Sequence, residues 1–475
     1  MTADQRSQGG SSHQEEAKAN GEAGSKRQLP VLVMTAIPMA GHVQPTIHVA
    51  QAMVQRGFEV IFITASEFRE KVQDAGAEWV EAAKFMTEED AAARNEIPVP
   101  VRVLFDLEKL FLPAIPVRTA TVRTVLERIR ERDPAREVIV VAESISAAVV
   151  GFKYGAPLPR GYDAFPKTIG LNVVPLVVSS DDTAPFGPGL PPDATESGRA
   201  RNRLLNAGLL EGPFKVIVEK QKQIFTDMGC TRWPERALFD CWLESFDTLF
   251  QMCSPSLEYP RADLHPSIRY AGALPKKGIS PNYVYPAWWS EIQSNTALPA
   301  GAPEKKFVIA VAQGTIATSY DEVIIPTIRA LAQREDVIVI ALLGVKGASL
   351  SADVEIPANT KVVDYMPYDA ALEHADLFVS NGGYGSMTHG VINAVPMVVA
   401  GMTEDKTEVC ARAEYAGLAI NLKTQTPSSE EIAAAVQKVL ANPKYKEKAV
   451  RLMKENQDLD CLAIIEREIM LYSQK

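Results

Sequence analysis

A glycine-rich turn between two short apolar runs is the first place in this chain where the residue types indicate chemistry. The run 377–381 is typical of a buried strand, and it ends at the turn 382–386, Gly-Gly-Tyr-Gly-Ser. Helix-like sequence follows, and a second buried run lies at 396–401. Glycine lets the backbone approach a ligand, and the free N–H groups at a helix start favour an anion such as phosphate. The pattern predicts a phosphate site, although a glycine cluster taken alone would favour a turn that binds nothing.

A histidine and a carboxylate follow two predicted strands in the first half of the chain. His42 comes after the apolar run 29–37, and Glu143 comes directly after the run 136–142. Because ligands of open parallel sheets bind at the carboxyl ends of the strands, both side chains are expected at that edge. A histidine has an ordinary pKa of about 6.5, which suits a general base near neutral pH. The alternatives are a packing role for His42 and a place in a solvated helix start for Glu143.

The order of the apolar runs predicts two α/β domains. Further strands are expected at 58–64, 168–176 and 247–252 in the first half, and at 307–311, 336–343, 361–365 and 418–422 in the second. The first strand is followed by a turn with only one glycine, Gly41, so the Gly-x-Gly-x-x-Gly fingerprint of dinucleotide-binding folds is absent there. This absence argues against an NAD enzyme.

The second half resembles the donor-binding signature of the family 1 UDP-glycosyltransferases. The residues that carry the resemblance are Tyr365-Met366-Pro367-Tyr368, Asn381-Gly382-Gly383-Tyr384-Gly385-Ser386 and Glu404-Asp405-Lys406. Their order and spacing match the family. The chain has Tyr365 where the family usually has Trp, Tyr368 for Gln, Asn381 for His and Lys406 for Gln. The sequence of these motifs is most similar to that of fungal and actinobacterial small-molecule glucosyltransferases of the macrolide type.

The resemblance implies a fold and a domain plan. The expected class is α/β, of the GT-B type, in which two Rossmann-like domains with parallel sheets face each other and a C-terminal helix crosses back to the N-domain. The boundaries that we assign are 1–28 for a disordered arm, 29–255 for the acceptor-binding domain, 256–306 for the linker, 307–444 for the UDP-sugar-binding domain, and 445–475 for C-terminal helices that pack on the N-domain.

The resemblance also implies roles for single residues. His42, in Gly-His-x-x-Pro, holds the position of the catalytic base, and Glu143 that of the acidic residue that orients it, usually Asp. Tyr365 would stack on uracil, and Lys406 would supply a cation near the diphosphate. The residues that we assign to donor binding are Gly314, Thr315, Tyr365, Met366, Asn381, Gly382, Gly383, Gly385, Ser386, Glu404, Asp405 and Lys406.

These assignments predict an inverting, metal-independent transfer of a sugar from a UDP-sugar, UDP-glucose by default, to a hydroxyl of a small hydrophobic acceptor such as a phenol or polyketide. The irregular loop 179–192 is expected to line the acceptor pocket, with a plain surface connection as the alternative. No cofactor is expected beyond the UDP-sugar co-substrate. A UDP-sugar epimerase or hydrolase of the same fold, and a catalytically silent nucleotide-sugar-binding protein, are the alternative functions.

Composition limits the other classes of function. The chain has 475 residues, which favours two domains, and a net charge of −10, which argues against nucleic-acid binding. Its five cysteines have neither metal-site spacing nor the even number typical of a disulfide framework. No apolar stretch approaches the roughly 20 residues of a membrane span. We therefore expect a cytoplasmic protein without a membrane span, as a monomer or weak dimer.

Overall fold

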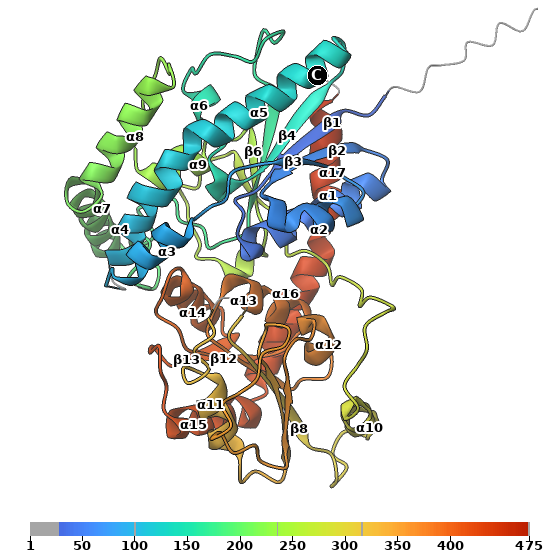
Figure 1. Ribbon diagram of the computed structural model, residues 1–475. Helices are drawn as coiled ribbons and strands as arrows, with labels where there is room; N and C mark the ends of the chain where they lie inside the picture. Colours follow the sequence, from blue (N-terminus) through green and yellow to red (C-terminus); the bar gives the residue numbers. More distant parts are fainter. Residues whose placement is uncertain (1–27, 99–100, 235, 315–316, 474–475) are drawn as a thin grey trace, which may run out of the picture.

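The computed structural model describes residues 28–98, 101–234, 236–314 and 317–473. Figure 1 shows two lobes: the N lobe, drawn mainly in blue to green, and the C lobe, drawn mainly in yellow to red. Each lobe is built on one parallel sheet with helices on its faces. The predicted GT-B class of two facing α/β domains is therefore confirmed. The predicted disordered arm lies, except for its last residue, outside the described residues.

The described part of the N lobe contains a seven-stranded parallel sheet in the order β3-β2-β1-β4-β5-β6-β7. Its strands are β1 (Val31–Thr35), β2 (Glu59–Thr64), β3 (Glu78–Glu81), β4 (Val138–Glu143), β5 (Lys167–Asn172), β6 (Thr248–Gln251) and β7 (Ile268–Tyr270). The chain order reverses between β1 and β4, which is where open α/β sheets bind ligands. This switch point places the segments after β1 and β4 next to each other.

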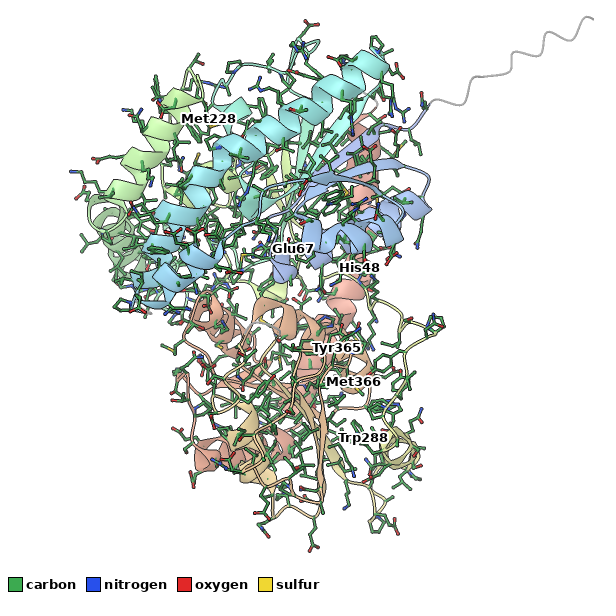
Figure 2. The ribbon with its side chains drawn as sticks, viewed as in Figure 1. His48, Glu67, Met228, Trp288, Tyr365 and Met366 are labelled. Carbon is green, nitrogen blue, oxygen red and sulfur yellow. The ribbon has the colours of Figure 1, made fainter. Side chains whose placement is uncertain are left out.

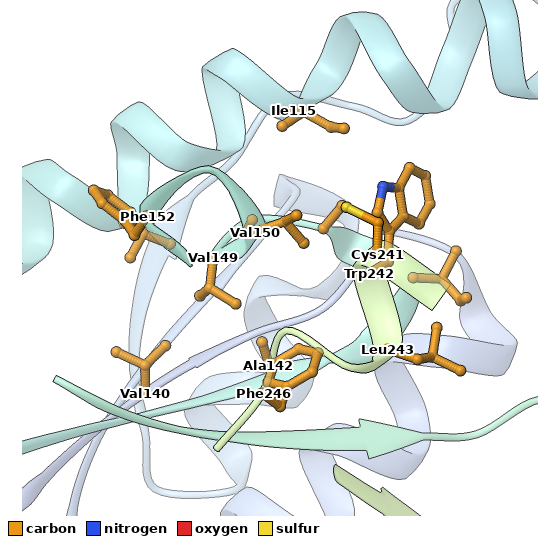
Figure 3. Close-up of a cluster of buried hydrophobic side chains, with 14 of the residues drawn as sticks. Ile115, Val140, Ala142, Val149, Val150, Phe152, Cys241, Trp242, Leu243 and Phe246 are labelled. Carbon is orange, nitrogen blue, oxygen red and sulfur yellow. The ribbon is translucent and has the colours of Figure 1, made fainter. Parts of the chain in front are cut away.

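Helices cover both faces of this sheet. They are α1 (Ala40–Gln55), α2 (Arg69–Asp74), α3 (Glu88–Asn95), α4 (Arg102–Phe105), α5 (Leu112–Arg132), α6 (Val150–Lys153), α7 (Glu196–Glu211), α8 (Lys215–Asp227) and α9 (Leu238–Leu243). Alternate residues of β1 enter two separate apolar cores. One core lies under α5 and α9, where Figure 3 shows Ile115, Val140 and Trp242 among its members. The other lies under α1 and α2.

The described part of the C lobe contains a six-stranded parallel sheet in the order β10-β9-β8-β11-β12-β13. Its strands are β8 (Phe307–Ala312), β9 (Val337–Leu342), β10 (Thr360–Val363), β11 (Leu377–Ser380), β12 (Met397–Val399) and β13 (Ala419–Asn421). Its helices are α11 (Ile324–Leu331), α12 (Tyr368–Leu372), α13 (Tyr384–Ile392), α14 (Lys406–Tyr415) and α15 (Ser429–Ala441). Here the order reverses between β8 and β11, so the turns after these two strands are neighbours.

Two of the domain boundaries need correction. The linker predicted at 256–306 starts too early, because β7 pairs with β6 and belongs to the N-lobe sheet. The remaining linker carries α10 (Trp289–Ala297), which Figure 1 shows beside the C lobe. The C-terminal range 445–475 is predicted to pack on the N lobe as a whole; its second helix, α17 (Cys461–Tyr472), enters an N-lobe core.

The first C-terminal helix, α16 (Lys444–Leu459), instead buries Ala449 and Leu452 in the core of the C lobe. Asp460 then adopts a left-handed conformation, with φ of 50°, and its carboxylate accepts a hydrogen bond from the Ala463 N–H at 3.2 Å. This residue therefore ends one helix and caps the next. The chain crosses between the lobes at this break.

Candidate active site

The predicted base and its acidic partner lie together at the β1–β4 switch point. His42 Nδ1 is 3.1 Å from Glu143 Oε1. Glu143 is completely buried, and the same Oε1 accepts a hydrogen bond from the Ile145 N–H at 2.8 Å. The sequence places His42 in a loop, but α1 already begins at Ala40, so the ring projects from the first turn of a helix. The pair is therefore held by two regular elements, the helix α1 and the strand β4.

The surroundings of His42 favour its protonated form. Burial alone lowers the pKa of His42, but the carboxylate of Glu143, with a smaller contribution from Asp405, more than offsets this and raises the pKa above its ordinary value. Arg118 acts in the opposite direction. An imidazole with these neighbours can accept a proton and is stabilised as the imidazolium that forms.

Asp405 belongs to the C lobe, in the segment between β12 and α14, yet its charge is felt by His42. Burial raises the pKa of Asp405, while Lys406 and His42 lower it in part. The predicted donor side and the predicted base therefore face each other across the two lobes. This is the arrangement that transfer between a donor in one lobe and an acceptor in the other requires.

The segment that follows Glu143 is fixed by α5. Arg118 Nη1 donates to the Ser146 carbonyl at 3.1 Å, and Thr119 Oγ1 donates to the Ala148 carbonyl at 3.0 Å. Ala147 between them has a left-handed φ of 51°. Both α5 side chains are buried. The chain can leave β4 in a sharp turn because its carbonyl groups find these donors, and the turn sets the direction of the Glu143 side chain.

The glycine turn of the C lobe is shaped as an open cradle. Gly382 has a φ of +76°, and a Cβ on it would lie 2.2 Å from Cys410 Sγ, so only glycine fits. The next helix, α13, begins at Tyr384 with Gly383 as its N-cap and no side-chain cap. A Cβ added to Gly385 would meet nothing within 4 Å. Gly385, in the first turn of this nine-residue helix, is exposed, so the uncapped helix start has room beside it for an anion such as a diphosphate.

The other predicted phosphate-site residues lie around this cradle. Asn381 is buried, and its Nδ2 donates to the Gln313 carbonyl at 2.8 Å, which ties the turn after β11 to the turn after β8. Gly314 in that second turn has a φ of +80° and open space around it. Ser386 Oγ is 3.5 Å from the Tyr368 hydroxyl. Thr315 lies outside the described residues.

Figure 2 shows the predicted uracil-binding residues Tyr365 and Met366 in the half of the C lobe that is nearer to the N lobe. Tyr365 is 39% exposed, which leaves part of the residue accessible for stacking. The ammonium of Lys346 lies 5.7 Å from the ring centroid. Met366 is buried in the C-lobe core, which leaves its backbone as the part that could contact a base.

Lys406 and Glu404 pair with each other. The Lys406 ammonium contacts the Glu404 carboxylate and lies 3.0 Å from Thr403 Oγ1. Arg94 of the N lobe lies 3.5 Å from the other oxygen of Glu404. The alkyl part of Lys406 packs against Gly401, beside the Asn381 carbonyl. The predicted cation is thus next to the glycine turn, with its charge shared with the residue expected to bind sugar hydroxyls.

The predicted acceptor loop is attached to the C lobe. The N–H groups of Gly187 and Gly189 donate to Glu408 Oε1 at 2.7 and 2.8 Å. Glu408 is buried in α14, which starts directly after Asp405. The loop 179–192 therefore rests on the helix next to the predicted sugar-binding residues.

Sequence reasoning misses Arg94, which pairs with Glu404 across the lobes, and Arg118, which holds the turn after Glu143 within the N lobe. Neither belongs to a motif, and a signal in the sequence exists for Arg118 alone, a charged residue within a largely apolar stretch of helix. Among the residues that the structure describes, no helix is long and apolar enough to cross a membrane.

Comparison with known proteins gives independent matches over nearly the whole chain. A model of the C-terminal domain of erythromycin biosynthesis protein CIII-like proteins matches residues 327–466. UDP-glucosyltransferase 1 of Beauveria bassiana (strain ARSEF 2860) is 36% identical over 449 residues, which cover 93% of this chain and 95% of that protein. The 4'-demethylrebeccamycin synthase of Lentzea aerocolonigenes is 33% identical over 432 residues, which cover 90% of this chain and 95% of that protein.

Solved structures agree on the fold. The glycotransferase of kitacinnamycin superposes with a TM-score of 0.66 at 18% identity, covering 93% of this chain and 99% of that one. With relatives above 30% identity along almost its full length, the chain belongs to the family 1 UDP-glycosyltransferases and is an enzyme that moves a sugar from a UDP-sugar to a small-molecule acceptor.

Proposed function

We propose that this enzyme transfers glucose from UDP-glucose to a hydroxyl of a small hydrophobic acceptor, such as a phenol or polyketide, with inversion and without a metal ion. The observation that carries the proposal is the position of His42. Its ring lies 3.1 Å from a buried carboxylate in the N lobe and within electrostatic reach of Asp405 in the C lobe. The name of the Beauveria bassiana relative supports glucose as the sugar.

The acceptor hydroxyl gives its proton to His42 Nε2, the ring nitrogen that faces away from Glu143. Glu143 fixes the tautomer and stabilises the imidazolium. The acceptor oxygen attacks the anomeric carbon while the bond to the UDP oxygen breaks. Because this is a single displacement, an α-linked donor gives a β-linked product. We assign to Asp405 and Glu404 the role of accepting hydrogen bonds from sugar hydroxyls.

The leaving diphosphate is stabilised by the first N–H groups of α13 and by the dipole of that helix. The open space around Gly385 and Gly314 supports this role. No group of three or more His, Cys, Asp or Glu side chains with metal-ligand geometry occurs among the described residues. We assign the stabilisation of the leaving group to backbone donors and to the hydroxyl of Ser386.

An apolar acceptor is supported by the side chains near the Glu143 turn. Ile145 and Ala148 of this turn belong to the apolar core under α5. Phe111 is one of the partly buried apolar side chains that pack on the same core, and its ring centroid lies 4.9 Å from that of Phe85, edge to face. Aromatic edges of this kind suit a flat, apolar ring.

The test is an assay of the full chain with UDP-glucose and a panel of phenols, with and without EDTA. We expect a β-glucoside, identified by mass spectrometry and by its anomeric proton coupling, unchanged yields with EDTA, and loss of product in His42→Ala. Free glucose without a glucoside would instead identify a hydrolase. An α-linked product would exclude the single displacement.

A further inference from the structure

A chain of hydrogen bonds between buried side chains runs from the Glu143 turn to the start of α13. Ser144 Oγ donates to Asn172 Oδ1 at 2.7 Å, and Asn172 Nδ2 donates to Gln251 Oε1 at 2.5 Å. Gln251 Nε2 then donates to the Tyr384 hydroxyl at 2.8 Å. Ser144, Asn172 and Gln251 have no exposed surface, and Tyr384 is 7% exposed. These hydrogen bonds therefore link the two lobes through side chains that are shielded from water.

The three N-lobe members come from neighbouring strands. Ser144 follows β4, Asn172 ends β5 and Gln251 ends β6, and these strands are adjacent in the sheet. Asn172 and Gln251 are direct partners in the β5–β6 pairing. The order of the strands thus aligns three polar side chains along one sheet edge. Tyr384, the fourth member, reaches this row from the C lobe.

The side chains in this hydrogen-bond chain have further hydrogen-bond partners, so the chain fits only one arrangement of the two lobes. Asn172 Nδ2 and Gln251 Nε2 also donate to the Val174 carbonyl at 2.9 and 3.0 Å. The Tyr384 hydroxyl lies against the buried Cys253 thiol, and burial raises the pKa of Tyr384 well above its ordinary value, so the hydroxyl stays protonated. Buried polar groups destabilise a structure when they lose their partners, so a shift of either lobe is disfavoured.

We propose that Tyr384 is a positioning residue that holds the start of α13 in register with the His42–Glu143 pair through Gln251 and Asn172. Tyr384 is the first residue of the helix whose N–H groups would bind the diphosphate. Ser144, at the other end of this chain of hydrogen bonds, directly follows Glu143 in the sequence. The inference rests on the proposed function, since the register matters for a reaction between a donor in one lobe and a base in the other. A misplacement of about 1 Å can lower a rate by about 100-fold.

The first test is Tyr384→Phe in the full-length enzyme, which removes one hydroxyl and leaves the ring. We expect kcat for transfer to fall about 10-fold or more, while the Kd of UDP stays within about twofold and the pH profile of kcat/KM is unchanged. The matched control is Tyr162→Phe, which removes a hydroxyl that donates to the Leu126 carbonyl at 3.1 Å within the N lobe. An unchanged kcat in Tyr384→Phe, or an equal loss in the control, would overturn the proposal.

The second test asks whether the chain transmits position. Ser144 and Tyr384 are separated by Asn172 and Gln251, and the effects of separated residues are normally additive. We expect Ser144→Ala and Tyr384→Phe to be non-additive in kcat, with the double variant little worse than the poorer single variant. Additive losses in kcat would show that Ser144 and Tyr384 act independently and would refute the proposal that the hydrogen-bond chain couples them.

Amide hydrogen exchange provides a readout that needs no turnover. Each single variant should speed exchange in both segments 144–148 and 383–387, although each substitution lies in only one of them. Faster exchange in the substituted segment alone would overturn the proposal. If the wild type failed to form a glucoside, the proposed function would fail while this measurement still decided whether the chain couples the lobes.

Discussion

Glu143→Gln should remove the charge beside His42 while keeping the shape of the side chain. The two residues lie 3.1 Å apart, and the glutamate is completely buried. At an effective dielectric constant of about 20, unit charges at this distance attract by at most about 5 kcal/mol. Removal of one partner of a buried pair costs about 3–5 kcal/mol. A loss of about 3 kcal/mol in the stabilisation of the imidazolium corresponds to a fall in kcat of roughly 100-fold.

The same variant should shift the pH profile. In the wild type, burial lowers the pKa of His42, and Glu143 reverses this so that the pKa lies above 6.5. Because the base must be neutral to accept a proton, wild-type kcat/KM should rise with pH through this raised pKa. Without the carboxylate, burial dominates, so the acid limb of the profile should move to lower pH while the plateau falls.

The assay is initial-rate glucoside formation by the wild type and Glu143→Gln between about pH 5 and 9. The raised pKa of His42 also predicts how the stability of the fold depends on pH. Because the folded-state pKa of His42 is raised, the ion pair stabilises the fold below about pH 6.5, and this contribution is lost as the pH rises through the raised pKa. The excess Tm of the wild type over the variant should therefore shrink with rising pH. An acid limb that stayed in place or moved to higher pH would refute the reasoning.

Three further predictions concern other residues of the site. Arg118→Met should move the acid limb of the kcat/KM profile to higher pH, because the Arg118 cation lowers the pKa of His42. Arg118→Lys keeps a positive charge and should show a smaller shift, and the pH profile of kcat/KM measures both variants. Gly382→Ala should lower Tm, at a cost of about 1–3 kcal/mol or more for a strained backbone, because a Cβ there would lie 2.2 Å from a buried thiol. Gly385→Ala, which has open space around it, should keep its Tm and weaken UDP binding, so calorimetry and UDP titration separate the two glycines. Lys406→Ala should raise the KM for UDP-glucose several-fold in steady-state kinetics, and unchanged KM and kcat would exclude this lysine from the donor site.

The central strands could be predicted from the sequence because both of their faces are buried. β1 and β4 have no exposed residue, and their sequences are almost continuously apolar. The sequence does not indicate β3, because this edge strand reads Glu-Trp-Val-Glu and has two exposed glutamates. At β7, which is three residues long, the proline-rich sequence indicates only a short extended segment at 268–274 within the predicted linker, and not a strand of the N-lobe sheet.

The residues of the site also differ in whether they can be predicted from the sequence. His42 and Glu143 can be predicted because the ends of parallel strands meet at one edge. Arg118 and Tyr384 cannot, because their partners are distant in the sequence: Arg118 binds a carbonyl 28 residues away, and Tyr384 binds a side chain 133 residues away. Only the tertiary fold creates these contacts, and no local spacing of residue types records them.

The attachment of the loop 179–192 to α14 bears on how such enzymes can be recombined. Gly187 and Gly189 share one oxygen of Glu408, which lies 221 residues after the first of them. A chimera that joins the N lobe of one relative to the C lobe of another would keep the conformation of this loop only if its α14 offered a matching carboxylate. The two halves of the enzyme are therefore not independent modules, and a chimera that is to keep this loop conformation has to inherit the loop and this helix together.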